Sequence, residues 1–126
     1  MEVIDKNDVV KDVIDKFKEK GLEITHANFG GHRKPDEVQN VRPDVIAWDN
    51  DKDLYHIAAV TRAEVFDKTD TIDKIKVLSN LMMGKGRSKD TRIPFYLAMP
   101  KGQLEKIDQK LDKYNLERKN LMPMEC

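Results

Sequence analysis

The sequence has few of the features that mark a secreted or a membrane-bound protein. Its 126 residues include one cysteine, Cys126, which is the last residue. One thiol forms no disulfide framework and no zinc-ligand spacing, which fits a reducing cytosol. No apolar run approaches the roughly 20 residues of a membrane span, and the charged N-terminal segment has no signal-peptide core. We therefore expect a cytoplasmic protein with no membrane partner.

An excess of charge of one sign is also absent, because 23 Lys and Arg residues balance 23 Asp and Glu residues. The chain as a whole therefore has no electrostatic attraction for nucleic acid, and such binding requires a local basic patch. The length fits one domain, so residues 1–126 are expected to share a single core.

Apolar periodicity predicts three helices, and apolar runs of strand length predict the strands between them. The helices are expected at 8–20, 69–83 and 103–115, and the strands at 22–29, 44–49, 54–61 and 93–99. A short last strand within 116–124 is restricted to an edge or an end by Pro123. The polar turn NDKD suits an antiparallel hairpin between the second and third strands. Helices on both faces of such a sheet predict a three-layer α/β sandwich with a mixed sheet.

This order of elements, with Pro43 and Asp44 opening the second strand, resembles the restriction-endonuclease-like superfamily, the PD-(D/E)xK nucleases. The resemblance covers almost the whole chain. In that family the Asp after the proline and an acid on the third strand bind Mg²⁺, and a lysine two residues later orients the attacking water. The resemblance therefore implies Asp44 as a metal ligand, since Mg²⁺ prefers carboxylate oxygens and stabilises charge on the scissile phosphate.

The third strand departs from the family pattern. Ala59 stands where the acid is expected, and Thr61 stands where the lysine is expected. A register shifted by one residue offers Val60 and Arg62, which restores a cation but no acid. One carboxylate alone is a weak Mg²⁺ site. The sequence therefore predicts a degenerate centre with weak or absent cleavage.

Displaced residues are the alternative source of a complete centre, as in some members of that family. The candidates that follow the third strand are Arg62, Glu64, Asp67 and Lys68, and those on the first helix are Asp8 and Asp12. Among them, the resemblance selects Arg62, Glu64 and Lys68 as catalytic partners of Asp44. The plainer interpretation is that Asp44 caps backbone groups, and that Arg62 and Glu64 are charges at a helix entry.

Two basic loops are the candidate nucleic-acid contacts. The segment GKGRSKDTR carries one acid and four cations, which are Lys85, Arg87, Lys89 and Arg92. It lacks the spacing of a nucleotide P-loop, whereas Lys and Arg side chains that neutralise phosphates dominate nucleic-acid affinity. Arg33 and Lys34 form a smaller basic spot after Gly30 and Gly31.

These features predict a nuclease-derived protein that binds DNA or RNA with weak or absent metal-dependent cleavage. Two alternatives remain open. The first is an active Mg²⁺-dependent nuclease that uses the displaced residues. The second is a non-catalytic interaction module that forms a homodimer through an exposed strand or its methionine-rich helix.

Overall fold

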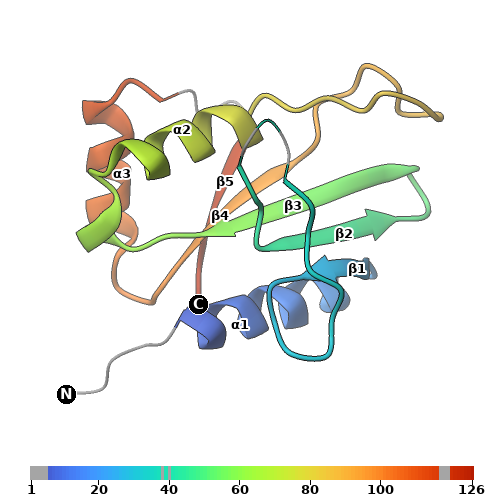
Figure 1. Ribbon diagram of the computed structural model, residues 1–126, viewed down its shortest axis with the longest axis horizontal. Helices are drawn as coiled ribbons and strands as arrows, with labels where there is room; N and C mark the ends of the chain where they lie inside the picture. Colours follow the sequence, from blue (N-terminus) through green and yellow to red (C-terminus); the bar gives the residue numbers. More distant parts are fainter. Residues whose placement is uncertain (1–5, 38, 40, 117–119) are drawn as a thin grey trace.

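The described residues form a mixed α/β fold of three helices and one five-stranded sheet (Figure 1). The computed structural model describes residues 6–37, 39, 41–116 and 120–126. The helices are α1 (Lys6–Glu19), α2 (Thr69–Leu78) and α3 (Leu104–Lys113), and a single 3-10 turn covers Ala63–Val65. The strands are β1 (Glu23–Ala27), β2 (Val45–Asp49), β3 (Leu54–Val60), β4 (Phe95–Met99) and β5 (Leu121–Glu125).

The sheet has the order β1-β2-β3-β4-β5 and is antiparallel in one half and parallel in the other. The predicted hairpin is confirmed, because β2 and β3 pair antiparallel with Val45 opposite Ala58 and Trp48 opposite Tyr55. A crossover through α2 then brings β4 parallel to β3, and a crossover through α3 brings β5 parallel to β4. The last strand is confirmed as an edge strand, the position that Pro123 permits.

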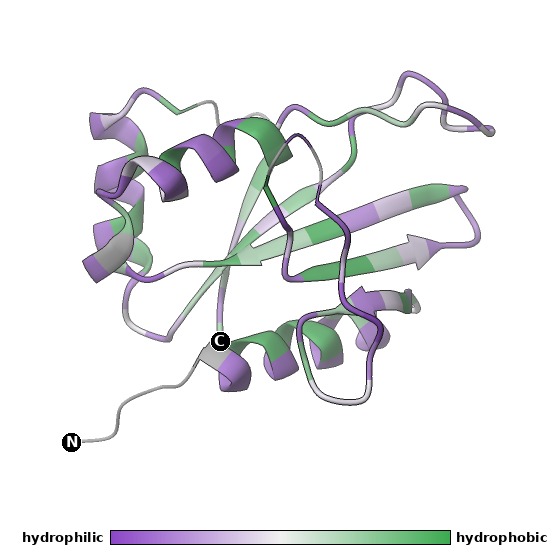
Figure 2. Cartoon of the chain, viewed as in Figure 1, coloured by the Kyte–Doolittle hydropathy of each residue, from purple (hydrophilic) through white to green (hydrophobic). Residues whose placement is uncertain are grey.

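The helices lie on both faces of the sheet, with α1 on one side and α2 and α3 on the other (Figures 1 and 2). The alternation of strand side chains divides the core accordingly. Along β3, Ala58 and Val60 pack toward α1, whereas Ile57 and Ala59 pack toward α2 and α3. All five residues of β4 are buried, as expected for a parallel strand that is covered on both faces.

The second helix is shorter than the sequence predicts, because α2 ends at Leu78 and not near residue 83. The chain continues as an extended arm that pairs with the returning segment before β4. The amide of Met83 donates to the carbonyl of Thr91, and the amide of Ile93 donates to that of Leu81. These non-local hydrogen bonds replace the last helical turn. Among the described residues, no helix therefore covers the hairpin end of β2 and β3 on the α2 side of the sheet (Figure 1).

The described helices are all too short or too polar to traverse a lipid bilayer.

Candidate functional site

Asp44 lies at the start of β2 and is buried, with 2% of its surface exposed. Its Oδ2 atom accepts a hydrogen bond of 2.7 Å from the amide of Val60 and lies 3.6 Å from the ammonium group of Lys74 on α2. The amide of Asp44 also donates to the carbonyl of Ala58 at 2.8 Å. The side chain therefore fastens the start of β2 to the end of β3 and to α2.

A pocket of about 330 Å³ opens between the end of β3 and α2. Its lining comes from β3 and the residues after it, from α2 and from β4, and consists of Ala59, Val60, Thr61, Arg62, Asp70, Thr71, Lys74, Ile75 and Leu97. Lys74 also pairs with Asp44, so the pocket lies beside the buried carboxylate. The lining thus includes two cations, Arg62 and Lys74, and one acid, Asp70.

Thr61 carries an unusual polar atom in this pocket. The residue is 5% exposed, and its buried Oγ1 has no hydrogen-bond partner. Buried hydroxyl groups are nearly always paired, so an unpaired one costs stability. The burial of this oxygen keeps it away from the open space of the pocket. The groups of the lining that suit an oxyanion are therefore the cations Arg62 and Lys74.

The register of β3 decides which side chains could hold a metal ion. Ala59, Val60 and Thr61 all belong to the pocket lining, and the side chain of Val60 also packs against the core on the α1 side. The position at which the family has its third-strand acid therefore faces the pocket, but it is occupied by Ala59. In the part of the chain that the structure describes, no three His, Cys, Asp or Glu side chains are grouped to hold a metal ion. Mg²⁺ requires several oxygen ligands, and Asp44 faces an ammonium group instead, so these residues do not fit a Mg²⁺ centre.

The displaced candidates lie in different places. Arg62 lines the pocket. Glu64 and Lys68 are exposed, in the 3-10 turn and immediately before α2, and neither of these described residues is part of the pocket lining. Asp8 and Asp12 are exposed on α1, which covers the opposite face of the sheet. The structure therefore brings Arg62, alone among these candidates, to the pocket beside Asp44.

Asp67 binds α3. Its carboxylate accepts hydrogen bonds from Lys110 and from Tyr114. These bonds, chiefly that from Lys110, lower the pKa of Asp67, and the bond from Tyr114 to Asp67 raises the pKa of that phenol. Asp67 thus joins the start of α2 to α3.

Sequence reasoning missed the residues of α2 that reach the pocket, which are Asp70, Thr71 and Lys74. Asp70 and Lys74 are four positions apart and therefore share one face of a helix. The buried residues Ile75 and Leu78 mark the core side of the same helix. The four-residue spacing of Asp70 and Lys74 can be read from the sequence. It indicates a site only once the side of α2 that faces Asp44 is known.

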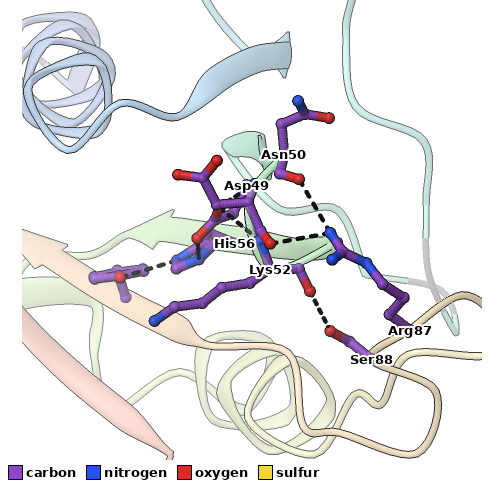
Figure 3. A network of polar contacts seen from close by, with 8 residues as sticks. Asp49, Asn50, Lys52, His56, Arg87 and Ser88 are labelled. Carbon is purple, nitrogen blue, oxygen red and sulfur yellow. Dashed lines mark hydrogen bonds and ion pairs between the residues drawn. The ribbon is translucent and has the colours of Figure 1, made fainter.

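The basic loop 84–92 is fastened to the turn of the β2–β3 hairpin (Figure 3). The guanidinium group of Arg87 donates a hydrogen bond to the carbonyl of Asp51 at 3.0 Å. The backbone amide of Arg87 donates to the carboxylate of Asp53 at 2.9 Å. The hydroxyl group of Ser88 donates to the carbonyl of Lys52. Arg87 therefore acts first as a clamp within the protein.

The other predicted phosphate contacts differ in their exposure. Lys85 and Lys89 are exposed on the fastened loop, and Arg33 and Lys34 are exposed in the long β1–β2 connection. Arg92 is half-buried, and its backbone forms a bridge with Met82. Lys85 and Lys89 are consequently the cations of the basic loop that are best placed to contact phosphate groups.

We expect Gly86→Ala to lower the free energy of unfolding by about 1–2 kcal/mol, because it strains the loop at a left-handed position. Gly86 has a φ of +85°, and a Cβ there would collide with the carboxylate of Asp53. Gly84→Ala is the matched control, since a Cβ added at Gly84 would meet no atom within 4 Å. Urea unfolding of the two variants measures the difference. Equal stabilities would show that the clamp does not constrain Gly86.

A second polar cluster lies on the α1 side of the hairpin (Figure 3). The Nδ1 atom of His56 is 3.0 Å from the hydroxyl group of Tyr96, and its Nε2 atom is 3.8 Å from Oδ2 of Asp49. The edge of Phe17 also contacts the ring. Burial lowers the pKa of His56, and the opposing attraction of Asp49 only partly offsets this effect.

Acidification is expected to destabilise the protein through His56. Because the folded-state pKa lies below the ordinary 6.5, the stabilising contribution is fully present above pH 6.5 and is lost as the pH falls through the folded-state pKa. Lys52 and Lys20 also disfavour the protonated ring. Urea unfolding between pH 7.5 and pH 5 should show a smaller loss of stability for His56→Phe than for the parent protein. Identical pH profiles would contradict this role.

Comparisons with known proteins place the chain in no family: no family model matches it, and no curated protein or solved structure is significantly similar to it. The class that the structure defines is therefore a mixed α/β protein with a five-stranded sheet. Its function has to be inferred from the pocket.

Proposed function

We propose that this chain is a nuclease-derived, restriction-endonuclease-like protein that binds the phosphates of DNA or RNA and has little or no metal-dependent cleavage. One observation carries the proposal: the carboxylate of Asp44 faces the ammonium group of Lys74, where the family would hold a metal ion. The sheet supports it too, since three antiparallel strands followed by a helical crossover to a parallel strand agree with the order that the resemblance implies.

The chemistry of the pocket suits a phosphate group. A guanidinium group matches two phosphate oxygens at once, and an ammonium group offers three further donors. Arg62 and Lys74 both belong to the pocket lining, so these donors face one space. The two carboxylates of Asp44 and Asp70 balance the positive charges of Arg62 and Lys74. The affinity of the pocket for phosphate therefore depends more on the geometry of its hydrogen-bond donors than on net charge. Lys85 and Lys89 add attraction for a polyanion along the fastened loop.

Binding is tested by titrating labelled single- and double-stranded DNA and RNA at several salt concentrations and following fluorescence anisotropy. Arg62→Ala should weaken binding about tenfold, because it removes charge-assisted hydrogen bonds. Glu64→Ala is the matched control, since Glu64 lies one turn away and outside the pocket. Thr61→Val should stabilise the free protein by about 1 kcal/mol, because it removes an unpaired buried hydroxyl group. Undiminished binding by Arg62→Ala would refute the pocket as the phosphate site.

Cleavage is tested on the same substrates with Mg²⁺ and with Mn²⁺. The parent protein should produce little or no cleavage, because its pocket lacks the carboxylates that hold the ion. Robust cleavage that disappears in Asp44→Asn would overturn this proposal. That result would favour the active nuclease with displaced residues.

A further inference from the structure

The face of the sheet that α2 leaves uncovered contains an apolar groove. One hollow of about 540 Å³ is lined by Trp48, Tyr55, Met82 and Lys85 among others, and an adjoining hollow of about 280 Å³ reaches Pro43. The two hollows share Tyr55, Met82 and Ile93, so they form one groove along β2. It ends at the residue that precedes Asp44.

Large apolar side chains are exposed in this groove. Tyr55 is 39% exposed and Met82 is 54% exposed. The rings of Trp48 and Tyr55 meet edge to face, with their centroids 4.8 Å apart. Val45 and Ala47 of β2 pack on the α1 side of the sheet. Ile46 and Trp48 alternate with them along the strand and therefore point to the opposite side, where α2 is short. A contiguous exposed apolar patch of this kind marks a binding surface.

A cation lies at the aromatic end of the groove. Lys85 lines the same hollow as Trp48 and is flanked by two glycines, so little side-chain bulk surrounds it. The clamp at Arg87 holds this part of the loop against the hairpin. Asp53 also lines the hollow, but its carboxylate accepts the amide of Arg87. The groove thus offers flat apolar surfaces beside an exposed positive charge.

We infer that this groove binds unpaired bases of a single-stranded nucleic acid, an inference that rests on the proposed function. A nucleotide combines a flat π-surface with a negative phosphate, and proteins bind single strands by pairing aromatic platforms with cations. From residue 44 to residue 48 the extended chain spans about 13 Å, which accommodates roughly four bases stacked about 3.4 Å apart. The bases lie on Tyr55 and Trp48, one phosphate lies against Lys85, and the strand continues toward Lys74.

The sequence provides its own reporter, since Trp48 is the one tryptophan. An unlabelled ten-residue oligothymidylate should quench the emission of Trp48, and the quenching should follow the binding curve that anisotropy gives for the same labelled strand. A duplex of equal length should bind with much less quenching, because its bases are already stacked.

Substitutions separate stacking from electrostatic attraction. Tyr55→Ala should weaken oligothymidylate binding at least about fivefold at every salt concentration, because it removes one stacking surface. It should leave the salt slope unchanged, whereas Lys85→Ala should flatten that slope by about 0.7. Met122→Ala is the matched control, because Met122 is 37% exposed but lies on β5 at the far edge of the sheet. The control should bind as the parent protein does.

The outcomes distinguish this inference from the proposed function. If anisotropy reports binding while Trp48 emission and Tyr55→Ala affinity are unchanged, the base subsite is refuted and phosphate binding stands. If no nucleic acid binds, both fail. If Trp48 emission changes with protein concentration alone and light scattering reports a dimer, the groove is occupied by a second copy and the base subsite is overturned.

Discussion

Replacing Asp44 with alanine is expected to lower the free energy of unfolding by about 3 kcal/mol, the cost of breaking a buried, charge-assisted hydrogen bond and its ion pair. The variant leaves the amide of Val60 without its acceptor and removes the partner that Oδ2 provides to Lys74. Urea unfolding measures the loss. Asp36→Ala, at an exposed position of the β1–β2 connection, should change stability by less than about 0.5 kcal/mol.

Two further variants identify which partner matters. Asp44→Asn keeps an oxygen acceptor for Val60 and should therefore lose less stability than Asp44→Ala. A double-mutant cycle of Asp44→Asn with Lys74→Met should give a coupling energy of about 0.5–3 kcal/mol, the range for residues in direct contact. A coupling energy near zero would show that the two charges do not depend on each other.

The second large effect is expected from restoring the family's third-strand residues. Ala59→Glu with Thr61→Lys places a carboxylate and an ammonium group in the pocket, at positions that face it. Without metal the new carboxylate should cost a few kcal/mol, because Ala59 is buried. Mg²⁺ should restore about 1.4 kcal/mol when its free concentration is ten times its Kd. Cleavage need not return, because the surrounding residues are not arranged for it.

Val60→Glu is the matched control for this experiment. Its side chain packs against the core on the α1 side, whereas that of Ala59 packs on the α2 side. It should therefore lose stability that Mg²⁺ does not restore. Thermal unfolding with and without Mg²⁺ compares the two. An equal response of the Ala59→Glu, Thr61→Lys double variant and of Val60→Glu to the ion would contradict the register of β3 on which the degenerate centre depends.

The regular elements of the fold could be predicted because their signals are local. Helical periodicity predicted the three helices of the described residues, apolar runs of strand length predicted their five strands, and the NDKD turn predicted the hairpin. The end of α2 was predicted five residues too late, because Leu81 to Met83 continue an apolar helical pattern. These residues are instead extended, because they form backbone hydrogen bonds with Thr91 and Ile93. The local sequence gives no signal for this pairing.

The candidate site could be predicted only in part, for the same reason. Asp44 was identified because a proline followed by an aspartate at the start of a strand resembles the family motif, and Ala59 and Thr61 came from aligning the third strand with the register of that family. Lys74 was missed, since its approach to Asp44 depends on how α2 rotates and packs against the sheet. The role of Arg87 as a clamp depends on the meeting of two loops 36 positions apart in sequence.

The ion pair of Asp44 and Lys74 also bears on how the protein could be regulated. A carboxylate that is balanced by a dissociable ion changes its state with the supply of that ion. Here the balancing ammonium group belongs to Lys74 of the same chain. Every folded molecule therefore contains one such group for each Asp44 carboxylate. Chelators and fluctuations in divalent ions leave such a pair intact. Acetylation of Lys74 would remove the charge and would therefore disrupt the pair.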